Sequence, residues 1–450
     1  MTEAEGRRVT ARGDASAGVS AAPAVRRSLP VRYGILALLC GCVTINYLDR
    51  ALLGVSLPSL ERELGLVPAV AGVLLSAFSW TYFLAQVPAG VLLDRLAVRG
   101  MYSGAVFAWS LVTLLHAVAG GLRSLLGLRL LLGLAEAPCF PANNTILAKW
   151  FPSGERARAV SLYTAAEYVG LSFLSPILYW TLSVAGWRTL FLAAGVIGIT
   201  YSALFAQRYR DPQDHPAVSA AELELIARGG GLPRGMTPVR FSLPAVRALL
   251  SHRQISGLCL GQFAVHSTLT FFLTWFPSYL VTARHIGWIQ AGLFAVLPYA
   301  AGFCGILVAG WWSDRLLARG RSLTFARKTP VITGLVLATG IIAANWVESN
   351  GLIVLILAIA FFAQGMSGSS WAVISEVAPP GQLGLIGGLF NASGNLAGIV
   401  TPLVIGGIVQ ITGSFVGALY FVGLVALVGA AAWIFVVGPI QPLEQVHAAP

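Results

Sequence analysis

Runs of about 20 apolar residues, separated by short polar breaks, recur along almost the whole chain. A helix rises 1.5 Å per residue, so a run of this length crosses the hydrocarbon core of a bilayer, which is about 30 Å thick. We expect an all-α polytopic membrane protein whose even number of helices places both termini on one side. The pattern predicts twelve transmembrane helices, at residues 33–57, 69–92, 101–120, 122–149, 156–183, 187–207, 253–281, 288–312, 328–346, 351–377, 382–408 and 413–437.

The one long polar break, at residues 208–252, divides the predicted helices into two groups of six. Within it, Ser219 and Glu222 have the spacing of a capping box, which predicts a short amphipathic helix on the membrane surface. The predicted domains are an N-terminal tail at 1–30, a six-helix bundle at 31–207, a linker at 208–252, a second six-helix bundle at 253–438 and a C-terminal tail at 439–450.

Two charged residues, Arg129 and Glu136, lie inside the fourth predicted span. A charge near the bilayer centre costs about 3 kcal/mol, and intramembrane ionisable groups usually mark a transport route. Seven residues make two helical turns, so both side chains lie on one face, which we expect to line a solute pathway. An ion pair that only docks two helices is the alternative. Pro138 and Pro141 follow, and we expect them to loosen the helix at Glu136.

A charged motif that follows the second predicted span recurs, with identical offsets, after the eighth. Internal duplication of this kind is typical of transporters in which two bundles rock about a central site. We expect the glycines to let helices approach closely and the charged residues to stabilise one closed state. The two copies consist of Gly90, Asp94, Arg95 and Arg99, and of Gly310, Asp314, Arg315 and Arg319.

Composition and charge place the chain in a lipid bilayer, since 56% of its residues are hydrophobic and 10% are charged. The net charge of +11 does not indicate nucleic-acid binding, because the basic residues fall in short loops and no recognition module is present. Lys and Arg gather in the tails, the linker and the loops on their side, which predicts a cell (inner) membrane protein with cytoplasmic termini. The opposite loops hold Arg62, Arg123, Arg188 and Arg284.

Signals for enzymatic or metal chemistry are missing from the sequence. There is no HExxH motif, and GMSGS at 365–369 is not a nucleophile elbow. The five cysteines lack metal-site or redox spacing, and His116 and His266 stand alone in apolar runs. We therefore expect no enzymatic activity, no metal and no cofactor.

The repeated motif resembles the cytoplasmic-loop signature of the major facilitator superfamily. Longer stretches resemble the anion:cation symporter family within it, above all bacterial symporters that carry D-galactonate, hexuronates or glucarate with protons. The similarity covers residues 31–438 and implies two pseudo-symmetric six-helix bundles. The stretches are NYLDR at 46–50, RLLLGLAEAPCFPANNTILAKW at 129–150, WFPSGERARAVSLYTAAEYVGLSF at 150–173, FFLTWFPSYL at 271–280, FARKTP at 325–330 and GLFNASGNLAGIVTPLVIG at 388–406.

The resemblance implies roles for individual residues. Asp49 and Glu136 would bind protons, and Arg129 would respond when Glu136 changes protonation. Arg50 would hold the substrate carboxylate. The remaining contacts to a sugar acid would come from Tyr47, Tyr82, Gln262, Ser370, Trp371 and Asn391.

Two acidic residues depart from the family pattern. Glu167 stands where the galactonate-type pattern has glutamine, and Glu376 stands where a small or hydroxyl residue is usual. Glu167 would line the substrate site, either as an added proton-binding group or as a contact to a different sugar hydroxyl. For Glu376, near the end of its span, we favour a gate or helix-end role.

The same residues fit a sugar acid on their own chemistry, because an anion covered with hydroxyls needs one cation and several neutral donors and acceptors. Arg50 supplies a planar fork that matches a carboxylate. Each neutral residue taken alone could instead bond a neighbouring helix, and Trp371 could be packing.

The function expected from the sequence is proton-coupled uptake of a sugar acid by alternating access. The expected partners are the organic anion, protons and the lipid bilayer, and we expect a monomer. Transport of another carboxylate, aromatic or dicarboxylic, is an alternative. A second alternative is efflux of a drug-like cation by proton antiport, against which the buried arginines Arg50 and Arg129 argue.

Overall fold

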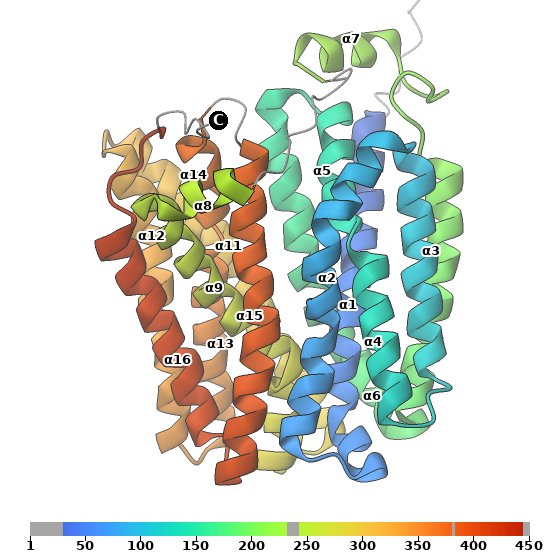
Figure 1. The fold of residues 1–450 in the computed structure, drawn as a ribbon, viewed down its shortest axis with the longest axis vertical. Coiled ribbons are helices and arrows are strands. Elements are labelled where there is room, and N and C mark those ends of the chain that lie inside the picture. The colour runs from blue at the N-terminus through green and yellow to red at the C-terminus, as the bar shows by residue number, and fades with distance from the viewer. Residues whose placement is uncertain (1–29, 232–242, 380–382, 444–450) are drawn as a thin grey trace, which may run out of the picture.

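A computed structural model describes residues 30–231, 243–379 and 383–443, and this part of the chain is almost entirely helical (Figure 1). The helices of the first half are α1 (Val31–Leu64), α2 (Pro68–Arg95), α3 (Val98–His116), α4 (Leu122–Glu136), α5 (Cys139–Trp150) and α6 (Ser153–Arg208). Those of the second half are α9 (Arg253–Thr274), α10 (Phe276–Ser278), the π-helix η1 (Tyr279–Ala283), α11 (Trp288–Ala318), α12 (Leu323–Ala338), the 3₁₀-helix η2 (Thr339–Trp346), α13 (Asn350–Ser367), α14 (Ser370–Val377), α15 (Leu383–Thr412), α16 (Val416–Ala431) and the π-helix η3 (Ala432–Val436).

Eleven of the described helical segments are long and apolar enough to cross a membrane. One of them, α6, is 56 residues long and bends at Gly186, whose φ of 77° is a left-handed conformation that glycine adopts without strain. The bend separates the fifth and sixth predicted spans, so α6 crosses twice. The all-α polytopic fold predicted from the apolar pattern is confirmed.

Besides the span at 253–281, which is interrupted at Trp275 between α9 and α10, two predicted spans are broken. The predicted helix at 122–149 divides into α4 and α5, because the helix stops at Glu136 and resumes at Cys139. Pro138 lies at this break and has no backbone N–H to continue the helical ladder. The predicted helix at 351–377 divides in the same way into α13 and α14, at Gly368 and Ser369, where the sequence has no proline. This second break was not predicted.

The two halves meet along a seam in which α2 packs against α15 (Figure 1). On the same seam α6 packs against α11. The contacts are tight at the end of the molecule opposite to α7 (Ala220–Arg228). There a Cβ atom on Gly72 would lie 2.5 Å from the backbone oxygen of Pro402, so only glycine permits this approach between α2 and α15. We refer to the end that carries α7 as the linker end.

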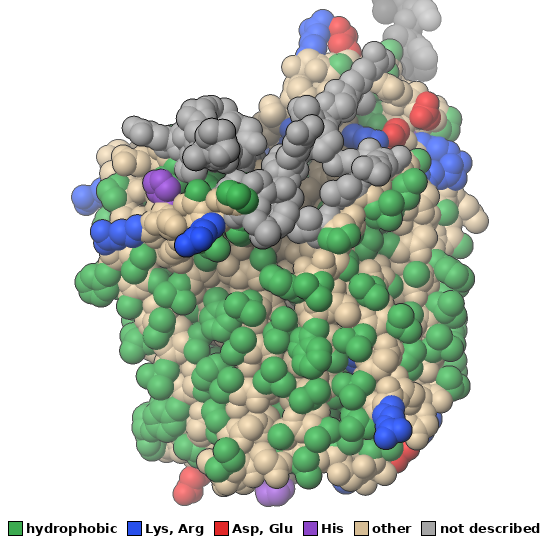
Figure 2. Space-filling model, in the orientation of Figure 1, with side chains coloured by type: hydrophobic (Ala, Val, Ile, Leu, Met, Phe, Trp, Pro, Cys, Tyr) green, Lys and Arg blue, Asp and Glu red, His purple; other side chains and the backbone are tan. Residues whose placement is uncertain are grey.

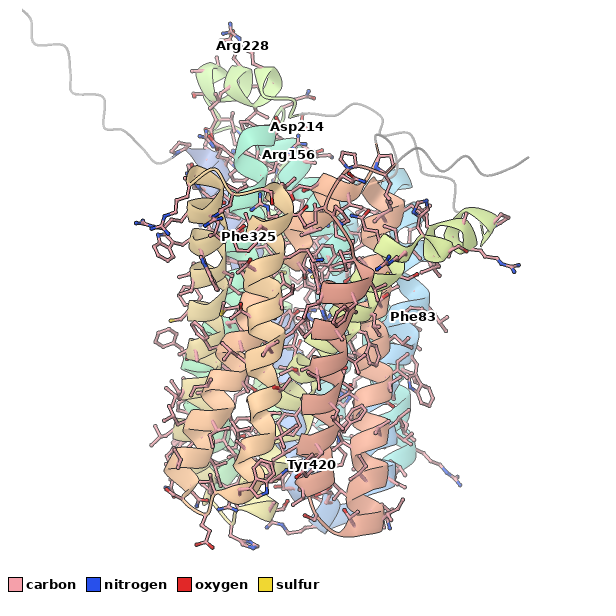
Figure 3. The ribbon with its side chains drawn as sticks, turned by 90° about the vertical axis from the view of Figure 1, so that its left-hand side faces the viewer. Phe83, Arg156, Asp214, Arg228, Phe325 and Tyr420 are labelled. Carbon is pink, nitrogen blue, oxygen red and sulfur yellow. The ribbon has the colours of Figure 1, made fainter. Side chains whose placement is uncertain are left out.

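The predicted linker helix is present as α7, and it lies over the first half (Figures 1 and 3). The Ser219 side chain accepts from the Glu222 backbone N–H at 3.2 Å, as the capping box predicts. The Glu222 carboxylate accepts from the backbone N–H groups of Val31 and Arg32 at 3.1 and 3.0 Å, and thus caps the start of α1. Arg32 also pairs with Glu155 at 3.2 Å.

The other linker helix, α8 (Leu243–Ser251), packs against α9 in the second half. Residues 232–242 between the two linker helices, and the tails at 1–29 and 444–450, lie outside the described residues. The face seen in Figure 2 is dominated by apolar side chains over its middle, and the charged side chains lie toward its two ends. This distribution fits a lipid-facing belt.

Candidate functional site

The charged residues singled out in the sequence lie inside the first half, on α1 and α4. Asp49, Arg129 and Glu136 are 1%, 2% and 0% exposed, so none of these side chains reaches solvent. Arg50, next to Asp49 on α1, keeps 16% of its side chain exposed.

Glu136 is held by two donors from α1. The Nε of Arg50 donates to Glu136 Oε2 at 3.1 Å, and the Nδ2 of Asn46 donates to the same oxygen at 2.7 Å. Asn46 and Arg50 are four residues apart, so they lie on one face of α1. Within the described ranges, Glu136 Oε1 has no hydrogen-bond partner.

The partner implied for Glu136, Arg129, does not contact it directly. Among the described residues the ion pair of Glu136 is with Arg50. Two turns along α4 place Arg129 on the same face as Glu136 but about 10 Å further along the axis, which is too far for a salt bridge along one helix. The guanidinium of Arg129 instead lies over the Phe78 ring, 5.7 Å from its centre, and interacts electrostatically with Glu136 and Asp49 without a salt bridge to either among the described residues.

Most polar side-chain atoms of Asp49 and Arg129 lack a hydrogen-bond partner among the described residues. Neither carboxylate oxygen of Asp49 has a hydrogen-bond partner among the described residues, and the same holds for Nε and Nη1 of Arg129. Buried ionised groups are costly without such partners. Burial of these two charged groups is therefore energetically unfavourable, and protonation of Asp49 or a new hydrogen-bond partner would relieve it.

The guanidinium of Arg50 lies within a cage of four aromatic rings. Its carbon is 4.7 Å from the ring centre of Tyr82 and 4.9 Å from that of Phe78. The Tyr47 and Phe140 rings lie at 5.2 and 5.9 Å. The rings orient the guanidinium, while Arg50 Nη2 is buried without a hydrogen-bond partner in the part of the chain that the structure describes.

The second half carries three of the residues assigned from the sequence, Gln262 on α9 and Ser370 and Trp371 on α14. Gln262 Oε1 accepts from the Ser370 hydroxyl at 3.3 Å, which joins α9 to the start of α14. Gln262 Nε2 is buried and has no partner among the described residues. Trp371 packs edge-on against Phe390 at 4.9 Å and keeps 44% of its surface exposed, so packing leaves part of it free.

Side-chain hydrogen bonds connect the two halves across the seam. Asn391 and Asn395 on α15 donate from their Nδ2 atoms to Gln86 Oε1 on α2, at 3.0 and 3.3 Å. Where α6 packs against the second half, the Tyr168 hydroxyl donates to Gln364 Oε1 at 3.3 Å. These amides link α2 to α15 and α6 to α13.

Glu167, the departure on α6, is 5% exposed and interacts with the hydroxyls of Tyr47 and Tyr168. It also lies within electrostatic range of Arg50. The structure thus brings Tyr47, Arg50, Tyr82 and Glu167 together in the first half.

Sequence reasoning assigned no role to several residues of this region. Asn46 lies directly before Tyr47 in the quoted NYLDR stretch, and the one-turn spacing of Phe78 and Tyr82 was the only signal for the aromatic cage. A neutral amide or a phenylalanine in an apolar span cannot be told from packing by pattern alone. The unassigned residues are Asn46, Phe78, Gln86, Phe140 and Gln364.

The first copy of the charged motif lies at the linker end of α2, where the side chains of Asp94 and Arg95 are outside the described set. Arg99 donates from Nε to the Ala206 backbone oxygen at 2.8 Å and so joins α3 to α6. In this conformation, a Cβ at Gly90 or Gly310 would meet none of the described residues within 4 Å, so the close helix approach expected there stays a prediction for another conformation. The seam is closed at the opposite end, which leaves both glycines without a close neighbour.

One residue of the second copy, Asp314, belongs to an ion-pair network around Arg327 on α12. Arg327 lies 3.6 Å from Asp314 on α11 and donates from Nε to Glu376 on α14 at 2.8 Å. The position of Glu376 at the end of α14 is consistent with the helix-end role favoured for it. Arg315 lies over the Trp311 ring at 5.3 Å, and Arg319 is the C-cap of α11.

Candidate metal ligands do not gather in the described ranges, where no three His, Cys, Asp or Glu side chains could hold a metal ion together. His116 Nδ1 is 2.8 Å from the Val112 backbone oxygen, and its ring stacks on Phe191.

Comparison with known sequences gives matches over most of the chain. The profile of the Major Facilitator Superfamily matches residues 39–371. The chain is 43% identical to a D-galactonate transporter of Escherichia coli O6:H1 over 91% of this chain and 96% of the relative. It is 40% identical to the probable galactarate/D-glucarate transporter GudP of Bacillus subtilis, over 94% and 95%, and 31% identical to a probable L-galactonate transporter of E. coli, over 91% and 89%.

Solved structures show a similar arrangement of helices. The inward open conformation of the xylose transporter XylE from E. coli matches with a TM-score of 0.70, at 14% identity over 91% of this chain and 97% of that one. A bacterial homologue of the human lysosomal transporter Spinster, in an inward-facing and unoccupied conformation, matches with a TM-score of 0.65 at 21% identity, over 91% and 95%. At these identities the likeness concerns the fold alone.

Proposed function

Because the chain belongs to the major facilitator superfamily, whose members are membrane transporters and not enzymes, we propose that it takes up an organic anion together with protons. The proposed substrate is a sugar acid such as D-galactonate or a related hexonate or hexuronate. Relatives that are 31–43% identical are named for the transport of such acids.

The observation that carries this proposal is the bonding of Arg50. Its Nε holds Glu136, four rings surround its guanidinium, and its buried Nη2 lacks a partner among the described residues. A guanidinium binds a carboxylate through two parallel N–H bonds, so a substrate carboxylate would supply the acceptor that Nη2 lacks. Arg50 would repel a cationic drug, which disfavours efflux of such compounds.

The neutral residues around Arg50 support a polyhydroxylated anion. Tyr47 and Tyr82 enclose the guanidinium from the first half. Gln262 and Ser370, which are hydrogen-bonded to each other, would complete the site from the second half. The unpartnered Gln262 Nε2 is a donor for a hydroxyl oxygen. An aromatic or aliphatic carboxylate would leave such donors unpaired and is therefore the weaker candidate.

Competition for Arg50 would couple protons to the substrate. Glu136 and the substrate carboxylate require the same guanidinium, so protonation of Glu136 makes Arg50 available to the substrate. By linkage, bound substrate favours protonated Glu136 to the same extent. Proton and anion then bind together, which is the requirement for symport.

Asp49 is the proposed second proton site. Its ionised form is costly in a buried position without donors, and its protonated form is much less so. Arg129, which interacts electrostatically with both Asp49 and Glu136, would stabilise whichever acid is ionised. The proposed coupling group is therefore Asp49, Arg129 and Glu136 together.

The distribution of basic residues supports an orientation in which the linker end is cytoplasmic. The tight seam at the opposite end then corresponds to a conformation closed to the outside, and both charged motifs would stabilise the state that closes the cytoplasmic end. Because both halves of one chain supply the site, a monomer suffices for transport. The proposed two-bundle division at residues 31–207 and 253–438 follows the seam.

Dicarboxylic sugar acids are the second candidate substrates, since several relatives are named for galactarate and glucarate. Glu167 bears on this choice because it is buried near Arg50 and the hydroxyls of Tyr47 and Tyr168. An ionised Glu167 would repel a second carboxylate on the substrate, which favours monocarboxylic acids.

Purified full-length protein in proteoliposomes provides the test. We expect concentrative uptake of labelled D-galactonate when a proton gradient is imposed, and its loss when an ionophore collapses the gradient. Undiminished accumulation without the gradient would refute proton coupling. A panel of unlabelled mono- and dicarboxylic sugar acids, aromatic acids and cationic drugs then ranks the alternatives by competition.

A further inference from the structure

Gln86 on α2 bonds across the seam to the second half, where the proposed substrate residues of the two halves approach each other. Its Oε1 accepts two hydrogen bonds, from Asn391 at 3.0 Å and from Asn395 at 3.3 Å. Asn391 is one of the proposed sugar contacts. The helices that carry these residues, α2 and α15, lie side by side along the seam (Figure 1).

The hydrogen-bonding capacity of the Gln86 amide is only half used. The carbonyl oxygen of a primary amide accepts two bonds and its nitrogen donates two. Oε1 of Gln86 is saturated by the two asparagines, whereas Nε2 is buried and has no partner among the described residues. A buried donor in this state gains from any acceptor that reaches it.

The position of Gln86 puts this donor beside the proposed carboxylate site. Gln86 follows Tyr82 by four residues, so the two side chains share one face of α2. Tyr82 in turn lies against the guanidinium of Arg50, at 4.7 Å. A sugar acid whose carboxylate binds Arg50 would extend its hydroxyls past Tyr82 toward Gln86 and Asn391.

We infer that Gln86 is a specificity-determining residue of the substrate site, which donates from Nε2 to a hydroxyl oxygen of the sugar acid while its Oε1 holds Asn391 and Asn395. This inference rests on the proposed function. The two accepted bonds fix the plane of the amide and hence the direction of the free N–H. A fixed donor distinguishes sugar acids by the position of one hydroxyl, because an acid without that hydroxyl leaves the donor unpaired.

If Gln86 only bridged the two helices, its removal would affect the binding of sugar acids differently. If Gln86 only joined α2 to α15, its removal would weaken the binding of every sugar acid by the same factor. If it contacts one hydroxyl, its removal weakens only acids that carry that hydroxyl. The dependence on substrate therefore separates the two roles.

The experiment uses calorimetry on the full-length protein with D-galactonate and a set of its monodeoxy analogues. Gln86→Met keeps the length of the side chain but removes both the acceptor and the donor. We expect it to bind D-galactonate about 3- to 10-fold more weakly than the unaltered protein, the factor that one neutral hydrogen bond supplies. For one deoxy analogue, both proteins should bind with equal affinity, and this identifies the hydroxyl.

Ser172→Ala is the matched control. Ser172 donates to the Val296 backbone oxygen at 3.2 Å. It therefore also joins the two halves, but between α6 and α11 instead of α2 and α15. Its loss should leave affinity and the ranking of analogues unchanged. Should Gln86→Met fail to fold, Gln86→Ser, whose hydroxyl is too short to span the seam, replaces it.

Three results would overturn the inference. Unaltered affinity for D-galactonate in the Gln86 variants would remove Gln86 from the site. Equal weakening for D-galactonate and all analogues would reduce Gln86 to a bridge. If the unaltered protein binds no sugar acid at all, the proposed function itself fails, and the inference fails with it.

Discussion

Glu136 and the substrate carboxylate are proposed to compete for Arg50. The Arg50→Lys variant tests whether the guanidinium binds the substrate. Lysine keeps the charge but cannot present two parallel N–H bonds to the substrate carboxylate. We expect Arg50→Lys to weaken D-galactonate binding at least about 10-fold, since one charge-assisted hydrogen bond contributes about 1.5–3 kcal/mol. Calorimetry measures the change, with Arg228→Lys on the exposed surface of α7 as control. Unchanged affinity would remove Arg50 from the substrate site.

Glu136→Gln separates binding from coupling. Glutamine reproduces the shape of the protonated acid and can still accept from Asn46, but it cannot release a proton. We expect counterflow exchange to persist and gradient-driven accumulation to be lost. Glu63→Gln, at the exposed end of α1, is the control and should affect neither. Equal loss of exchange and accumulation would make Glu136 a structural residue.

At this scale the sequence indicates where charge is costly but not how charges are paired. Arg129 and Glu136 stand out because ionisable side chains are rare in spans. Their spacing places them on one face of α4, yet the partner of Glu136 comes from α1, which only the packing of the two helices decides. The amide of Gln86 carries no comparable signal, because neutral polar residues also serve to join helices.

Among the helices, α7 and α1 are connected by an interaction that can be tested through stability. Glu222 caps α1 by accepting from the N–H groups of Val31 and Arg32. We expect Glu222→Ala to lower the free energy of unfolding by about 1–2 kcal/mol, as loss of a helix cap does. Thermal unfolding in detergent measures it, and hydrogen exchange should show faster exchange at the start of α1.

Glu224→Ala is the control for this change, because Glu224 lies on the same helix and pairs with the exposed Arg228. Exposed pairs of this kind contribute about 0.3–0.5 kcal/mol. If both variants lose the same small amount of stability, the cap on α1 is not significant.

The existence of most helices could be predicted, and their interruptions only in part. Pro138 indicates the break between α4 and α5 because it lacks a backbone donor. The break between α13 and α14 has no such residue, and it lies near Gly365, where α13 approaches the backbone of α11 at Gly302. Such a break depends on contacts between helices, which a local pattern does not contain.

At the scale of the whole molecule, the Glu167→Gln variant tests how much charge the protein moves for each substrate molecule. An additional proton moved across 100 mV contributes about 2.3 kcal/mol, which is roughly 40-fold in the accumulation limit. The two tyrosine hydroxyls beside Glu167 favour a contact role. We therefore expect Glu167→Gln to change the preference among sugar acids and to leave the charge moved per substrate unaltered.

Electrical recording on proteoliposomes, combined with labelled uptake, measures this ratio. A ratio lowered by one charge in Glu167→Gln would show instead that Glu167 carries a proton. No change in either quantity would exclude Glu167 from the site.

The closure of the seam at one end could not be predicted from sequence. The apolar pattern and the duplicated motif indicate two bundles, but the same residues must serve every conformation of the transport cycle. Gly72 is tightly packed against Pro402, whereas Gly90 on the same helix has open space beside it. The relative position of the two halves decides which end is closed. One sequence allows several such positions, so the sequence alone does not specify which of them the structure shows.

The cap that Glu222 places on α1 also bears on how the protein is made. The start of α1 leaves the ribosome before α7, because its capping carboxylate lies 190 residues further along the chain. At about 5–20 residues per second, translation reaches Glu222 roughly 10–40 s after it passes α1. The first bundle therefore inserts into the membrane with the beginning of α1 still unsecured. Emergence of α7 would mark the moment at which that bundle is complete, before most of the second has been synthesised.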